Sequence, residues 1–144
     1  MTCCFFGSRD TSSSILPALR NTIRRAITEY GTDRFLVGNQ GHFDYITQIM
    51  LNTFIKDEFP FIRWNVVLAY MPGTDPKHEP KDSSITIYPE GLEKVPPRFA
   101  ILRRNQWMTD HSDIVICHVT HSWGGAAKAV EYAEKKNKII LPIQ

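Results

Sequence analysis

Short apolar segments alternate with amphipathic segments along the chain, and this alternation limits the fold more than any other feature of the sequence. The apolar segments have the length of strands and lie at 2–6, 35–37, 63–70, 114–119 and 139–141. Most segments between them place apolar residues at helical spacing. We therefore predict an α/β fold: a Rossmann-like three-layer sandwich with a five-stranded parallel sheet, in the order 3-2-1-4-5, and helices on both faces.

Helices are expected between these strands, at about 15–30, 43–59, 98–111 and 125–136. The segment 71–97 breaks the pattern, because it holds six of the nine prolines and shows little periodicity. A loop of this length inside a compact domain is usually a lid or a binding loop. The sequence has no internal repeat, so we predict one domain over 1–144 with a long proline-rich loop at 71–97.

Composition and charge narrow the classes of function. The longest apolar runs are only strand-length, so we expect no membrane span, and the N-terminus lacks the pattern of a secretory signal. Cys3, Cys4 and Cys117 lie in apolar segments, which is typical of reduced core cysteines and predicts a cytoplasmic protein. A formal net charge of +2 is too weak to make nucleic acid an obligate partner.

We expect neither a metal ion nor a cofactor. Cys117, His118 and His121 form the best ligand cluster that the sequence offers. Cys117 and His118 point to opposite faces of a strand, however, and no fourth ligand is evident. His121 could instead contact a phosphate group.

Loops rich in glycine and polar residues follow the first, second and fourth predicted strands, at 7–10, 38–44 and 120–125. The carboxyl ends of parallel strands meet at one edge of the sheet, and ligands bind there where the strand order reverses. Glycine lets backbone N–H groups approach an anion, and the N-terminus of the following helix favours phosphate. The three loops therefore predict a ligand that carries phosphate.

Parts of the chain resemble a known family. Cys3–Arg9 resembles the opening FxGS motif of the LOG (lonely-guy) proteins of the SLOG superfamily. Arg104–Asp113 is similar to their RKxxMxxxSD segment, and Ser122–Glu131 to their PGGxGTxxE phosphate-binding turn. Val37–Asp44 is similar to the GGxxGxD loop of smaller SLOG relatives. The resemblance spans nearly the whole chain apart from the loop 71–97.

The resemblance implies a Rossmann-like nucleotide-binding domain. Some members of the superfamily bind nucleotide-derived signals, including those of the cyclic ADP-ribose type used in antiviral defence. This implies a sensor or sequestering protein whose partner is a nucleotide-derived small molecule with ribose and phosphate, and which forms a homo-oligomer. The ligand-binding residues expected from the loops and the resemblance are Gly7, Ser8, Arg9, Gly38, Asn39, Gln40, Gly41, Asp44, Arg104, His121, Ser122, Trp123, Gly124, Gly125, Lys128 and Glu131.

The alternative is an enzyme, a phosphoribohydrolase that releases the free base from nucleoside 5′-monophosphates. The resemblance then makes Arg104 and Glu131 catalytic, with Glu131 stabilising an oxocarbenium-like transition state. Trp123, Ala127 and Lys128 stand where these enzymes have proline, glycine and threonine, and this favours binding over catalysis. A third class, an interaction module whose partner docks on the proline-rich loop, needs no small ligand.

Several of these residues also have plain structural explanations. The glycines at 124–125 would serve a tight turn without any ligand. Trp123 could stack on a base or fill the space under its loop, and Asp44 could bind ribose or stabilise the start of a helix. Glu131 has an i, i+4 partner in Lys135, a favourable pair on a helix surface.

Overall fold

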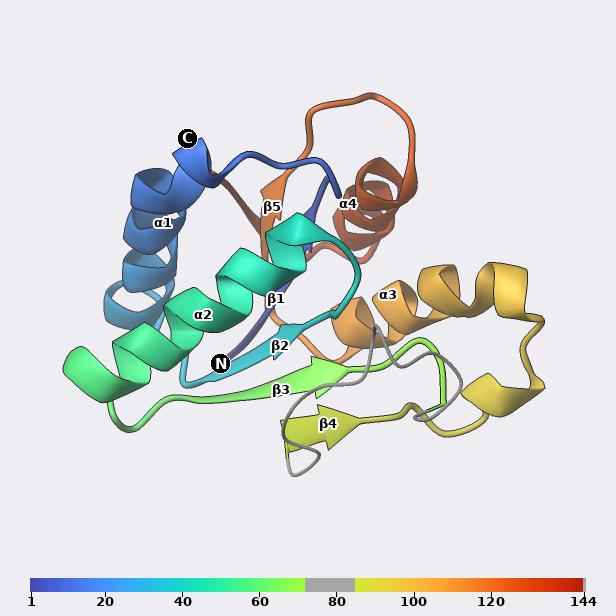
Figure 1. Cartoon of the computed structure of the whole chain (residues 1–144), viewed down its shortest axis with the longest axis horizontal. Coiled ribbons are helices and arrows are strands. Elements are labelled where there is room, and N and C mark those ends of the chain that lie inside the picture. The colour runs from blue at the N-terminus through green and yellow to red at the C-terminus, as the bar shows by residue number, and fades with distance from the viewer. Residues whose placement is uncertain (72–84, 144) are drawn as a thin grey trace.

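A parallel sheet forms the centre of the molecule. The computed structural model describes residues 1–71 and 85–143, and within them six strands join in the order β4-β3-β2-β1-β5-β6 (Figure 1). Every neighbouring pair is parallel. The strands are β1 (Thr2–Gly7), β2 (Arg34–Val37), β3 (Arg63–Val67), β4 (Thr86–Ile87), β5 (Ile114–His118) and β6 (Ile139–Pro142).

The predicted sheet of five strands is wrong by one strand, and the full strand order therefore differs from 3-2-1-4-5. The additional strand, β4, comes from the segment predicted as a loop and pairs with the edge strand β3, Thr86 opposite Val66 and Ile87 opposite Val67. Two residues are too few to show a period-two pattern, so this strand has no sequence signal. Residues 72–84 of the predicted loop lie outside the described residues.

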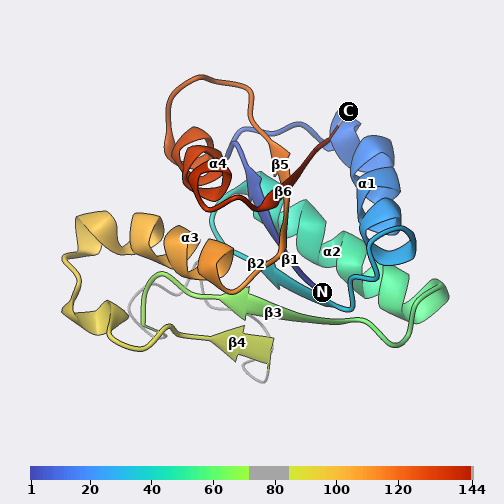
Figure 2. The ribbon, with the colours of Figure 1, turned by 180° about the vertical axis from the view of Figure 1, so that it is seen from behind.

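Helices cover both faces of the sheet, so the predicted three-layer α/β architecture is confirmed (Figures 1 and 2). The helices α1 (Leu16–Thr28) and α2 (His42–Asp57) lie on one face. The helices α3 (Ala100–Asp110) and α4 (Gly125–Lys135) lie on the other. Short 3-10 turns at Ser13–Ile15 and Pro97–Phe99 lead into α1 and α3. None of the helices in the described ranges has both the length and the apolar character needed to cross a bilayer.

The central strand β1 is buried on both faces and divides the core in two. Cys3 and Phe5 pack into the cluster beneath α1 and α2, whereas Cys4 and Phe6 pack into the cluster beneath α3 and α4. Successive side chains of a strand point to opposite faces, so a strand between two helical layers must be apolar at every position. This explains why the segment lacks an alternating pattern.

Gly7, at the end of β1, lets α2 pack closely against the sheet. A Cβ atom at this position would lie 2.2 to 2.5 Å from three ring carbons of Phe43, the second residue of α2. The Phe43 side chain is fully buried, so it has little room to move. Glycine is therefore required at position 7 by packing, whatever else the position does.

We expect Gly7→Ala to lower the free energy of unfolding by about 1–3 kcal/mol, because the added methyl group overpacks the contact with Phe43. The matched control is Gly125→Ala, since an added Cβ there meets no described atom within 4 Å. Urea denaturation of both variants tests this. Equal stability of the two variants, or a Gly7→Ala protein as stable as the parent, would contradict the packing role.

Candidate functional site

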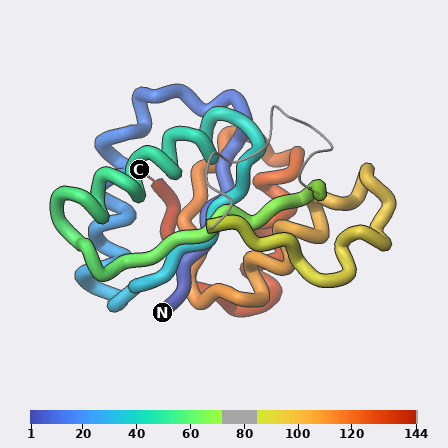
Figure 3. The backbone as a smooth tube through the Cα atoms, turned by 60° about the horizontal axis from the view of Figure 1, so that its bottom comes forward, coloured from blue at the N-terminus to red at the C-terminus, as the bar shows by residue number. Residues whose placement is uncertain are grey.

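The loops that follow β1, β2 and β5 meet at the carboxyl edge of the sheet, as predicted from the strand pattern. The loop after β1 lies between the other two (Figure 3). The Ser8 N–H donates to the His118 carbonyl over 3.1 Å, and the Thr120 hydroxyl donates to Ser8 Oγ over 3.0 Å. On the other side, the His42 N–H donates to the Arg9 carbonyl over 3.2 Å.

A cavity of about 470 Å³ opens between these loops and α3. Most of the predicted site residues line it: Gly7, Ser8, Arg9, Gly38, Gln40, Asp44, Arg104, His121, Trp123, Gly124 and Gly125. The volume falls within the range usual for small-ligand sites. Residues of all three predicted loops therefore line one cavity.

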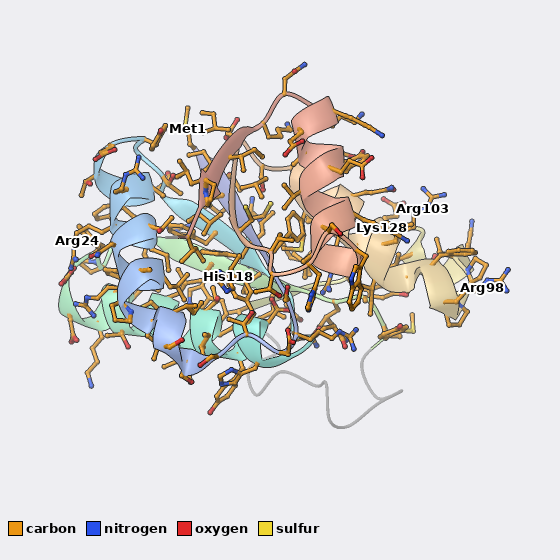
Figure 4. The ribbon with its side chains drawn as sticks, turned by 90° about the horizontal axis from the view of Figure 1, so that it is seen from above. Met1, Arg24, Arg98, Arg103, His118 and Lys128 are labelled. Carbon is orange, nitrogen blue, oxygen red and sulfur yellow. The ribbon has the colours of Figure 1, made fainter. Side chains whose placement is uncertain are left out.

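The remaining predicted residues do not line this cavity. Asn39 and Ser122 lie in the same loops without lining it, and Gly41 lies behind Arg9, whose Cβ is 3.0 Å from where a Gly41 Cβ would be. Lys128 and Glu131 line a separate groove of about 200 Å³ between α3 and α4. Figure 4 labels Lys128 on α4 and Arg103 on α3, the two helices that border this groove.

Lys128 and Glu131 have partners or surroundings that explain them without the predicted ligand. The Glu131 carboxylate lies 3.3 Å from Lys135 Nζ on the exposed side of α4. Both residues line the groove between α3 and α4 rather than the cavity between the loops. The predicted catalytic pair of Arg104 and Glu131 therefore lines two different cavities.

The wall that α3 presents to the cavity contains residues that the sequence analysis missed. Ile101, Asn105 and Met108 line the cavity together with Arg104. Their spacing of i, i+3, i+4 and i+7 places all four on one face of a helix. This periodicity is the signal that could have found Asn105, whose side-chain oxygen accepts a hydrogen bond from Arg104 Nε over 2.9 Å.

Two opposite charges are buried at the floor of the cavity. Asp44 is 8% exposed and Arg104 is 3% exposed, and both side chains come against Gly38. A Cβ at Gly38 would lie 2.6 Å from Asp44 Oδ2 and 2.7 Å from Arg104 Nη1. Glycine at position 38 is what admits both groups, and Asp44 Oδ2 also accepts the Gln40 N–H over 2.9 Å.

Burial dominates the electrostatics of the floor. It raises the pKa of the Asp44 carboxyl, although the Arg104 guanidinium, the Gln40 N–H and Arg9 all oppose the rise. Burial likewise lowers the pKa of Arg104, and the negative charge of Asp44 opposes that change. Each charge therefore recovers only part of its lost hydration from the protein.

The N-terminus of α4 faces the mouth of the cavity. Gly124 precedes the helix with φ at +96°, a conformation that favours glycine, and no side chain caps the first turn. A Cβ at Gly124 or Gly125 would meet no described atom within 4 Å, so the space beside these two Cα atoms is open. Uncapped N–H groups and the helix dipole together attract an anion.

An aromatic pair flanks the same mouth. The rings of His121 and Trp123 stack with centroids 4.4 Å apart and planes 14° apart. Trp123 is 70% exposed, so the interpretation that it fills space under its loop is wrong. His121 also lies 3.8 Å from the Asp10 carboxylate, which links this pair to the loop after β1.

The cysteines and histidines form no metal site in the part of the chain that is described. No three His, Cys, Asp or Glu side chains within it come close enough to hold an ion. Cys3, Cys4 and Cys117 are all free and buried, and burial raises the pKa of Cys4 to about 12 and that of Cys117 to about 11. These thiols therefore stay protonated at neutral pH.

Comparison with known proteins gives fold relatives only. No family model and no curated protein sequence matches the chain. DNA processing protein A from Helicobacter pylori, in a structure describing its single-stranded DNA binding mode, matches with a TM-score of 0.61 and 17% identity over 99% of this chain. DNA processing protein A (DprA) from Streptococcus pneumoniae matches with a TM-score of 0.68 and 15% identity over 98%. The chain spans 64% and 49% of those two proteins, respectively.

These neighbours overturn the expectation drawn from the LOG resemblance. They are DNA processing proteins, one of them described by its binding of single-stranded DNA, and neither is a LOG protein. Four predictions are therefore corrected: the small nucleotide ligand, the sensor or sequestering role in antiviral defence, the phosphoribohydrolase, and the absence of nucleic acid as an obligate partner. The physical reason is that glycine-rich loops and helix N-termini accept any phosphate group, including the phosphates of a nucleic-acid strand.

We expect Asp44→Asn to raise the melting temperature at pH 7. The pKa of Asp44 is raised in the folded state, so ionisation of this carboxyl group destabilises the folded protein relative to the unfolded chain. The destabilisation caused by the ionised carboxyl group is absent below the ordinary pKa of 3.8 and complete above the raised pKa. The gain should therefore shrink as the pH falls towards 3.8. Melting curves of both proteins from pH 3.5 to pH 8, roughly spanning this window, test this. A variant less stable than the parent at pH 7 would contradict it.

Proposed function

We propose that this chain binds single-stranded nucleic acid, with DNA as the leading candidate, at the mouth of the cavity. One observation carries the proposal: the exposed Trp123–His121 stack lies beside the uncapped N-terminus of α4. Aromatic platforms hold unpaired bases, and helix N-termini hold phosphates. A single strand of nucleic acid presents bases and phosphates in alternation, so the aromatic pair and the helix N-terminus suit one ligand.

The phosphate part of the site consists of backbone and one exposed arginine. Gly125 and Ala126, the first two residues of α4, line the cavity, as does Arg9. Arg9 is exposed, and its carbonyl accepts the His42 N–H, so its backbone is held between two loops. A guanidinium in this place can form a bidentate pair with a phosphodiester oxygen.

The aromatic part of the site explains why the strand must be single. In a duplex, each base is stacked between its neighbours and offers no free face to Trp123. Stacking of a base on an aromatic side chain does not depend strongly on which base it is. The mouth of the cavity is therefore suited to holding a strand without selecting its sequence.

The charge of the chain limits how the strand is held. A net charge of +2 gives little overall attraction for a long polyanion. Binding through few phosphates predicts modest affinity and a shallow dependence on salt. The single-stranded DNA binding described for the Helicobacter pylori neighbour supports the choice of ligand class. We also place the protein in the cytoplasm, where its three free cysteines would stay reduced.

Substitution of the platform tests the proposal. We expect Trp123→Ala to weaken the binding of a fluorescein-labelled single strand by roughly 5- to 150-fold, the range set by the stacking energy of one base. Phe61→Ala is the matched control, because Phe61 is also an exposed aromatic but lies just before β3, at the amino end of the strands. Anisotropy titrations with single-stranded and duplex forms of one sequence measure both. Tighter binding of the duplex, or equal losses in the two variants, would exclude the proposed mouth.

The salt dependence tests the phosphate contact separately. We expect Arg9→Gln to weaken binding by a similar factor for every sequence and to reduce the slope of log K against log salt by about 0.7, the value for one phosphate contact on a single strand. Arg25→Gln is the control, since Arg25 is an exposed arginine on α1 whose partner is Glu29. An unchanged slope in Arg9→Gln would show that Arg9 does not contact the backbone of the strand.

A further inference from the structure

The floor of the cavity holds polar groups that neither the mouth nor the fold uses. Arg104 donates from Nε to Asn105 and from Nη1 to the Val67 carbonyl, each over 2.9 Å. Its Nη2 group has no hydrogen-bond partner in the described ranges. Asp44 accepts one hydrogen bond, from the Gln40 N–H to Oδ2, and within the same ranges Oδ1 accepts none.

Gln40 adds a third open group to the floor. Its side chain is 8% exposed, and its Nε2 atom is buried without a partner among the described residues. Buried polar atoms of native proteins are almost always hydrogen-bonded, so each exception calls for an explanation. Gln40 Nε2 is such an exception, and Arg104 Nη2 and Asp44 Oδ1 in the same cavity also lack partners among the described residues, so a ligand in the cavity would complete all three.

A purely structural role explains only part of this arrangement. Asp44 lies in the first turn of α2, where a carboxylate is favourable, and it accepts the Gln40 N–H. That role needs neither a guanidinium opposite nor the missing side chain at Gly38 that admits both charges. A buried charge pair is also a poor source of stability. The floor is therefore better explained as a recognition surface.

We propose that the floor recognises the Watson–Crick edge of a guanine base in the bound strand, a proposal that rests on the function proposed above. Guanine presents two adjacent donors, N1–H and the N2 amino group, followed by the O6 acceptor. The two donors match the two oxygens of Asp44, and O6 matches the free Nη2 of Arg104. Thymine would place its O2 acceptor against the carboxylate, and adenine and cytosine each offer one donor beside an acceptor.

The size and access of the cavity agree with this assignment. Its volume of about 470 Å³ is enough for one base, and Ile101 and Met108 provide an apolar wall for the ring. The Watson–Crick edge is occupied in a duplex, so only an unpaired guanine can reach the floor. The mouth would then hold the strand, while the floor would select the base.

The test places one guanine in an otherwise uniform strand. The probes are dT12 strands that carry dG, dI, dA or dC at a central position, with dT12 itself as reference. We expect the dG strand to bind about tenfold more tightly than the others, because a bidentate contact discriminates by about that factor. Inosine lacks the N2 amino group, so the dI strand should lose most of this advantage. Asp44→Asn should reduce the preference for dG to less than about twofold.

Asp57→Asn is the matched control, because Asp57 is an exposed aspartate at the far end of α2. It should keep the preference for dG unchanged. Failure of every strand to bind would overturn the proposed function itself. Binding of all strands with equal affinity would overturn the guanine assignment and leave the proposed function standing. A preference for dG that persists in Asp44→Asn would overturn the assignment of Asp44, provided that the variant melts cooperatively.

Discussion

The close approach of α2 to the ends of β1 and β2 is the constraint on which the site depends. Three glycines permit it. Gly7 leaves room for Phe43, Gly38 leaves room for Asp44 and Arg104, and Gly41 begins α2 at φ +93° with Arg9 against it. A side chain at any of these glycines would push the first turn of α2 away from the sheet or strain the backbone. Gly7 and Gly38 also line the cavity, so its shape depends on the side chains that these two positions lack.

The mouth of the cavity is exposed to solvent, whereas its floor buries two charged side chains. The mouth consists of groups that lose little hydration in the folded protein: backbone amides, one arginine and an aromatic pair. The floor buries an aspartate and an arginine, and burial shifts the pKa of each towards its neutral form. Buried charges that do not stabilise a fold are a common mark of a functional site. We infer that affinity resides mainly at the mouth and selectivity at the floor.

The sequence predicted the layers of the fold and the meeting of three loops at one edge of the sheet for physical reasons. A strand buried on both faces, such as β1, is a continuous apolar run, and the carboxyl ends of parallel strands bring their loops together. The strand β4 was not predicted because two residues are too few to show the alternation of apolar and polar residues that marks a strand. Lys128 was misplaced because a motif gives its position along α4 but not which cavity it lines. The predicted class of ligand was wrong because a phosphate-binding loop does not distinguish a mononucleotide from a nucleic-acid strand.

An amide chemical-shift titration tests the central claim most directly, because it reports on every loop at once without a substitution. The labelled protein is titrated with an unlabelled dT12 strand and followed by two-dimensional ¹⁵N–¹H spectra. The account predicts that the largest changes fall at Gly7–Arg9, at Gly38–Gly41 and at the amides that begin α4. Changes centred on the α3–α4 groove around Lys128, or at the amino ends of the strands, would contradict it.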